Sequence, residues 1–170
     1  MLLGCLALGS CTNTVERAPG GILQRSQQDP ALSGNGEMLA VIVDQRGRPT
    51  VQLRDIQNGK ILPLRHFSRH QPHSSPSLSW NGRYLAVITQ RGNRRLMIIE
   101  DRLSGRVHPL PLPGGRDPVR LSLAPDARQV ALQVADQGHW RVELFDLSQI
   151  LEPDKPAGLQ RSIPSTELGS

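Results

Sequence analysis

One ten-residue stretch decides the fold, because it returns further along the chain. Leu32-Ser33-Gly34-Asn35-Gly36-Glu37-Met38-Leu39-Ala40-Val41 recurs at 78–87 as Leu-Ser-Trp-Asn-Gly-Arg-Tyr-Leu-Ala-Val, with seven identities in ten positions. A diverged third copy, Leu-Ala-Pro-Asp-Ala-Arg-Gln-Val-Ala-Leu, occupies 123–132. The turn positions 36, 82 and 127 lie 46 and 45 residues apart. This regular spacing indicates three repeats of 45–46 residues.

Each repeat is predicted to contain four short antiparallel strands. Asn-Gly or Pro-Asp turn signals precede apolar runs, and glycine-containing turns follow them, so each run begins a hairpin. The predicted hairpin strands are 38–43 with 51–54, 84–89 with 95–100, and 129–134 with 141–146. The sequence also predicts a short first strand, such as 77–80, and outer strands over 60–64 and 106–110. Four strands in about 45 residues is the size of a propeller blade.

The composition supports an all-β chain and excludes several other classes. Sixteen Gly and 14 Pro among 170 residues are spread along the sequence, which disfavours helical bundles and coiled coils. Clusters of Val, Ile and Leu argue against collagen and against pure disorder. The formal net charge is +5, but the arginines are scattered and aromatic residues make up only 3%. Surfaces that bind nucleic acids typically combine clustered cations with aromatic residues, so no nucleic acid is expected as a partner.

The repeated turns resemble the β-propeller repeats of the TolB periplasmic proteins. The resemblance rests on the Ser-x-Asn-Gly turns at 33–36 and 79–82, the Ala-Pro-Asp-Ala turn at 124–127, and the Leu-Ala-Val run that follows the first two. An aspartate, Asp55, Asp101 or Asp146, follows each turn position by 19 residues. The resemblance covers about 31–158 and implies four-stranded blades at 31–76, 77–121 and 122–158.

The sequence also departs from that family pattern. Gly34 and Trp80 stand where the family often has proline, and Ala127 stands where glycine is usual. Pro153 and Pro156 interrupt the fourth strand of the third repeat, which is expected over 149–157.

The N-terminal segment predicts that the protein is located at the cell envelope. Residues 1–11 are apolar but too short to span a bilayer, and Leu8-Gly9-Ser10-Cys11 resembles the lipobox of bacterial lipoproteins. That resemblance implies a signal peptide over 1–11 and a lipid on Cys11, which would anchor the chain to a membrane. No Lys or Arg precedes the apolar run, so we expect the true start further upstream. The alternative is an ordinary hydrophobic strand with two inert cysteines. Residues 12–30 are expected to be a flexible tether, and 159–170 a disordered tail.

Three blades pose a packing problem. Propellers typically close with four to eight blades, and three would leave two apolar faces open to water. The TolB propeller has six blades, so the resemblance suggests a homodimer that completes a ring. A partner protein covering the open faces and an open three-blade stack are the alternatives.

Few residues point to chemistry. The sequence has no Gly-x-Ser-x-Gly, phosphate loop or His-Glu-x-x-His, so we expect neither catalysis nor a cofactor. His66, His70 and His73 have a spacing that would allow a shared divalent metal. We interpret them instead as a histidine-rich loop between blades, where Arg65 and Arg69 would repel a cation, and expect no metal. The three repeated aspartates are interpreted as turn-stabilising residues. Trp80 and Trp140 are interpreted as blade-packing residues.

The sequence therefore predicts a noncatalytic lipoprotein, tethered in the periplasm, whose propeller repeats serve as a platform for one or more envelope proteins. The alternative is a periplasmic protein that binds a small ligand or glycan in the central funnel.

Overall fold

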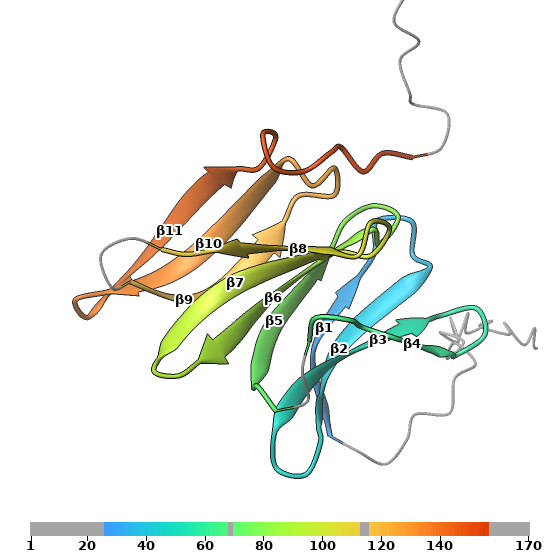
Figure 1. The fold of residues 1–170 in the computed structure, drawn as a ribbon, viewed down its shortest axis with the longest axis horizontal. Helices are drawn as coiled ribbons and strands as arrows, with labels where there is room; N and C mark the ends of the chain where they lie inside the picture. The colour runs from blue at the N-terminus through green and yellow to red at the C-terminus, as the bar shows by residue number, and fades with distance from the viewer. Residues whose placement is uncertain (1–25, 68–69, 113–115, 157–170) are drawn as a thin grey trace, which may run out of the picture.

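The chain folds into three antiparallel β-sheets that stack side by side as propeller blades (Figure 1). The computed structural model describes residues 26–67, 70–112 and 116–156. Blade 1 has the strand order β1 (Gln27–Leu32), β2 (Met38–Asp44), β3 (Pro49–Asp55) and β4 (Ile61–Leu62). Blade 2 has the order β5 (His73–Leu78), β6 (Tyr84–Arg91), β7 (Arg94–Asp101) and β8 (Arg106–Leu110). Blade 3 has β9 (Asp117–Leu123), β10 (Gln129–Asp136) and β11 (His139–Asp146). The all-β prediction of about three four-stranded blades is thus confirmed in its architecture.

Most strands lie where the turn signals predicted them. The turn residues Gly36, Gly82 and Ala127 all have positive φ, at 74°, 65° and 61°. Glycine adopts this conformation without steric cost, whereas alanine does so only under strain. The third repeat therefore keeps the backbone of the turn although its glycine has been replaced.

Two apolar layers hold the blades together. Successive side chains of a strand point to opposite sheet faces, so each central strand contributes to two layers. In β6, Leu85 and Val87 face blade 1, while Ala86 and Ile88 face blade 3. The layer between blades 1 and 2 includes Ile42, Val51, Leu53, Phe67, Leu78, Leu85, Val87 and Ile98. The layer between blades 2 and 3 includes Ile88, Met97, Ile99, Leu121, Leu123, Val130, Leu132 and Val134.

The structure differs from the predictions at the first strand of each blade. β1 begins at Gln27, inside the segment 12–30 that was expected to be a tether. β5 covers His73–Leu78 instead of 77–80. Both strands lack strong apolar alternation, because they carry Asp-Pro and Ser-Pro dipeptides at a local irregularity, and the sequence pattern underestimates their length.

Blade 3 has no fourth strand within the described residues. After β11 the chain crosses the ends of blades 2 and 3 as a C-terminal strap, which we define as residues 147–155 (Figure 1). Leu151 is buried in the layer between these blades, and Asp154 is also buried. Pro153 in the strap and Pro156 directly after it are tolerated, because this segment does not form an outer strand like β8 of blade 2. In the described part of the chain, no helix is long and apolar enough to cross a membrane.

Candidate binding surfaces

The first strand of each blade carries an irregularity at a corresponding position. The pairing of β1 with β2 shifts between Gln28 and Ala31, and the pairing of β5 with β6 shifts between Ser74 and Ser77. In blade 3 the shift lies opposite Gln133 and Val134 of β10. Bulges of this kind redirect side chains. Because β1, β5 and β9 are neighbours in the stack, the redirected side chains lie along one edge of it.

These irregularities surround a hollow of about 450 Å³ on the side of the first strands. It is lined by Asp29, Pro30, Ser75, Pro76, Val119 and Arg120. Asp29 and Ser75 have φ values of 50° and 49°, a conformation that is uncommon for residues other than glycine. Backbone strain of this kind clusters at functional sites, so two strained residues on one hollow make it a candidate binding site.

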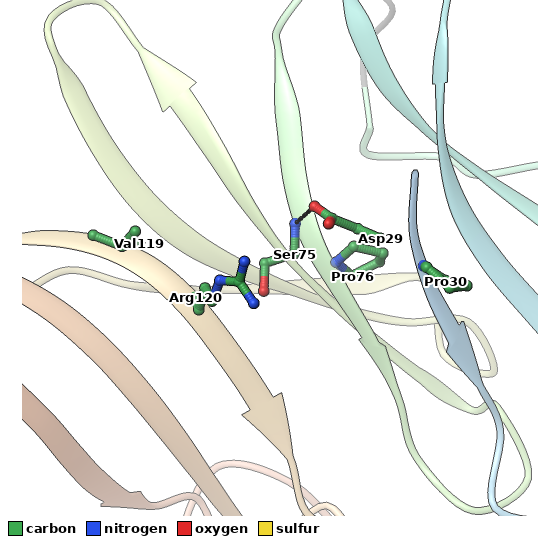
Figure 2. A pocket seen from close by; sticks show the side chains of 6 residues that line it. All are labelled: Asp29, Pro30, Ser75, Pro76, Val119 and Arg120. Carbon is green, nitrogen blue, oxygen red and sulfur yellow. Dashed lines mark hydrogen bonds between the residues drawn. The ribbon is translucent and has the colours of Figure 1, made fainter. Parts of the chain in front are cut away.

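The hollow places opposite charges on either side of a serine. Figure 2 shows Asp29 and Arg120 reaching toward Ser75 from opposite sides. The Ser75 amide donates to Asp29 Oδ2 at 3.3 Å, and Ser75 Oγ accepts from the Leu121 amide at 2.9 Å. A carboxylate and a guanidinium facing one space suit a polar or zwitterionic ligand. The sequence analysis missed this site; its signal was the Asp-Pro and Ser-Pro dipeptides 46 residues apart.

The structure does not bring His66, His70 and His73 together. His66 lies in the connection between blades 1 and 2, where its Nε2 is 2.7 Å from the carbonyl oxygen of Gly105. His70 is exposed, and His73 is buried in β5. Among the described residues no three His, Cys, Asp or Glu side chains converge as metal ligands. The shared-metal interpretation of these histidines therefore has no geometry to support it.

His73 instead forms part of the packing between blades 1 and 2. Its Nδ1 accepts a hydrogen bond from the Val51 amide at 3.2 Å, and its ring meets Phe67 edge-on with centroids 5.4 Å apart. Burial lowers the pKa of His73 from 6.5 to about 4, because the protonated ring would lose its hydration. His73 is therefore neutral at physiological pH, and its role is structural.

The repeated aspartates stabilise turns, as predicted. Asp55 Oδ1 accepts from the amides of Gln57 and Asn58, at 2.9 and 3.3 Å. Asp146 Oδ1 accepts from the Ser148 amide at 2.8 Å. Asp101 binds its turn in the same way, and its carboxylate also forms an ion pair with Arg83.

The two tryptophans differ in their surroundings. Trp80 packs between blades against Gly34, as expected. Trp140 does not pack between blades: it is 63% exposed on β11 together with Val142 and Leu144, which are each 72% exposed. These three residues alternate along the strand and so share one sheet face, which we call the open face of blade 3. The prediction for Trp140 was wrong because no described segment covers this face.

Cys11, the predicted site of lipid attachment, and the expected segments 1–11 and 159–170 lie outside the described residues.

Comparison with known proteins establishes the fold. No protein-family model and no curated protein matches the sequence. Among solved structures, TolB from Acinetobacter baumannii aligns with a TM-score of 0.58 and 18% identity, over 74% of this chain and 31% of that one. A putative TolB from Agrobacterium tumefaciens gives 0.56 and 17%, over 75% and 47%. The β-propeller domain of the trilobed protease from Pyrococcus furiosus gives 0.56 and 15%, over 79% and 44%.

The alignments therefore cover less than half the length of each of these chains. The TolB-like propeller fold of this protein is confirmed, as the fold of part of such a propeller.

Proposed function

We propose that this chain is a noncatalytic binding module of the bacterial envelope, which holds a protein partner on the open face of blade 3. The observation that carries the proposal is the row of exposed apolar side chains Trp140, Val142 and Leu144 on one strand. Contiguous apolar surface of this kind marks interaction sites, and tryptophan is among the residues that contribute most to binding.

Two independent features support the proposed location at the bacterial envelope. The segment before Cys11 resembles a lipobox, and the fold is similar to that of TolB proteins. On this proposal the lipid on Cys11 anchors the chain to a membrane, and the blades face the periplasm. Labelling of cells with an alkyne fatty acid tests the anchor. Cys11→Ser should lose the label and leave the membrane fraction, whereas Cys5→Ser should keep both; a label that survives Cys11→Ser refutes the anchor.

Site-specific photocrosslinking tests the open face. A photoreactive amino acid at position 144 should give discrete crosslinked bands in envelope preparations. The same group at Leu103 is the matched control, because this leucine is 78% exposed but lies in a turn of blade 2. Equal crosslinking from both positions, or none from 144, contradicts a role for this face.

The hollow beside Ser75 favours a second candidate function, the binding of a small ligand or glycan. The strained backbone at Asp29 and Ser75, with Arg120 opposite, is the observation in its favour. A glycan array followed by calorimetry tests it. Binding should weaken at least about tenfold in Arg120→Ala, since a charged hydrogen-bond donor is lost. Arg94→Ala, in β7 and away from the hollow, should bind normally.

A further inference from the structure

The open face of blade 3 repeats a contact surface that is used twice inside the chain. Val142 and Leu144 lie 45 residues after Met97 and Ile99 of β7, which in turn lie 46 residues after Val51 and Leu53 of β3. Met97 and Ile99 are buried against blade 3, and Val51 and Leu53 are buried against blade 2. The β11 pair therefore has the chemistry and the register of a surface that receives another sheet.

The other end of the stack does not offer a matching open surface. On the face of β2 that points away from blade 2, Val41 and Val43 are only 3% exposed. Thr50, opposite Val43 in β3, is buried on the same face. A second copy that approached head to tail would find little exposed apolar surface at Val41 and Val43. In the described part of the chain, the large apolar sheet face left open is that of blade 3.

We propose that the open face of blade 3 binds the same face of a second copy of this chain, across a two-fold axis close to Val142. This inference rests on the proposed function and names its partner. An isologous contact uses one patch twice and closes after two copies, so it needs only the one open apolar sheet face that the described residues provide. Val142 is the middle residue of the apolar row. When two such rows pair antiparallel, Val142 meets its own counterpart, and Trp140 of each copy meets Leu144 of the other.

The size of the face is compatible with a dimer of moderate affinity. The apolar row exposes on the order of 300 Å², at the low end of the largest patches on monomeric proteins. Ala131, Gln133 and Ala135 of β10 share this face, since they lie opposite Leu144, Val142 and Trp140 in the β10–β11 register. Together with Ser122 of β9, which lies opposite Ala131, they extend the surface toward the roughly 800 Å² per partner of a standard interface.

The missing outer strand leaves the outer edge of β11 unpaired among the described residues. β8 covers the edge of β7 in blade 2, whereas the strap carries the chain away from β11. A partner sheet can therefore approach β11 without displacing any described segment. The strand on which the apolar row lies is also an edge strand, which natural proteins rarely leave long and apolar without a partner.

Light scattering of the purified full chain, with paired charge variants, tests the proposal. The chain has a mass of 18.7 kDa, and we expect twice that mass at about 100 µM, where a dimer of micromolar affinity is formed. Val142→Lys and Val142→Glu should each weaken dimerisation at least about tenfold, because each buries like charges against each other. An equimolar mixture of the two variants should recover the dimer. Leu103→Lys is the control and should leave the dimer intact.

Recovery of the dimer in the mixture would show that residue 142 of one copy contacts residue 142 of the other. A head-to-tail dimer would not place these residues together, and unfolded variants would not recover a dimer. The inference is overturned if the chain is a monomer at all concentrations, or if neither Val142→Lys nor Val142→Glu weakens the dimer. Failure of the proposed function gives a different result, since crosslinking from position 144 then yields neither a dimer nor a band with any envelope protein. If position 144 crosslinks to a different protein and light scattering shows a monomer, the dimer is refuted and the proposed function is kept.

Discussion

Asp154 of the C-terminal strap accepts a hydrogen bond from the hydroxyl of Ser79, 75 residues earlier, at 2.5 Å. The same carboxylate accepts from the amide and the side chain of Asn81, both at 2.8 Å. Ser79 Oγ in turn accepts from the Tyr84 amide that begins β6. The strap is therefore bound to the repeated turn of blade 2, and it joins the third blade to the second by polar contacts as well as by the apolar layer.

Asp154→Ala should lower the free energy of unfolding by about 2–4 kcal/mol. The substitution leaves the buried hydroxyl of Ser79 without its acceptor and removes both hydrogen bonds from the exposed Asn81 to this carboxylate. Loss of the acceptor of a buried donor costs more than the net value of a hydrogen bond. Urea unfolding followed by circular dichroism measures the effect. Glu152→Ala is the control, because Glu152 is exposed and its ion pair with Arg83 should contribute less than about 1 kcal/mol. Equal losses for both variants would contradict this account of the strap.

Gly34 and Trp80 depend on each other, although each looks like an isolated departure from the family pattern. A Cβ atom at Gly34 would lie 2.5 Å from Cε3 and 2.9 Å from Cδ2 of the Trp80 indole. The turns that carry them are also joined by backbone hydrogen bonds, including Asn35 amide to Trp80 carbonyl at 2.9 Å. The absence of a side chain in blade 1 thus provides the space for the indole of blade 2.

Gly34→Ala should destabilise the protein by about 1–3 kcal/mol through this overpacking. The same substitution in a Trp80→Ala background should cost clearly less, because the indole contacts are gone and only the 3.1 Å approach to the Cα atom of residue 80 remains. A double-mutant cycle in urea measures the coupling. Additive effects of the two substitutions would show that the glycine serves another purpose.

Acid should weaken the contact between blades 1 and 2 through His73. The unfolded chain protonates this histidine below about pH 6.5, whereas burial delays protonation in the folded state to about pH 4. The unfolded state therefore binds more protons in that window, so stability falls as the pH decreases through it. The shift sets an upper limit of about 3 kcal/mol, and we expect about 1–2 kcal/mol between pH 7 and pH 4.

Urea unfolding at a series of pH values tests this. His73→Gln should be less stable at pH 7 and should lose less stability on acidification than the natural protein. His139→Gln, at the exposed first residue of β11, should keep the full pH dependence. A pH dependence that His73→Gln leaves unchanged would assign the effect to other groups.

The sequence predicted the repeated parts of this structure and missed the parts that occur once. Alternating apolar runs and turn dipeptides recur with the period, so the hairpin strands were located closely. The hollow beside Ser75 depends on register shifts, and no apolar pattern records a shift of register. Pro153 and Pro156 indicated an interrupted outer strand over 149–157, whereas the described part of this segment forms no strand. Its course depends on the contacts of Asp154 with Ser79 and Asn81, which no local pattern predicts. Trp140 was misjudged because the repeat pattern predicts a packed sheet face at this position, and no described segment packs against it.

The three repeated aspartates allow a graded test of one role in three environments. Asp55→Ala should cost about 1 kcal/mol, because it removes a turn-stabilising acceptor. Asp146→Ala should cost less than Asp55→Ala, because the Asp146 carboxylate is exposed to solvent. Asp101→Ala should cost about 2–4 kcal/mol, since Asp101 is buried and its removal also leaves Arg83 without its 2.9 Å partner. Thermal unfolding of the three variants under one condition measures the ranking.

The pH dependence separates the ion pair from the turn. Burial alone would raise the pKa of Asp101, but hydrogen bonds from Arg83, Ser104 and Leu103 outweigh it and lower the pKa from 3.8 to about 2. Between pH 3.8 and about 2, Asp101 therefore stays ionised in the folded state, whereas it takes up a proton in the unfolded state. The stabilisation that is present above pH 3.8 is lost as the pH falls toward 2. Asp101→Asn should keep part of the turn and lose this acid dependence. If Asp101→Asn and Asp55→Asn changed the acid limb equally, the pairing with Arg83 would not be its source.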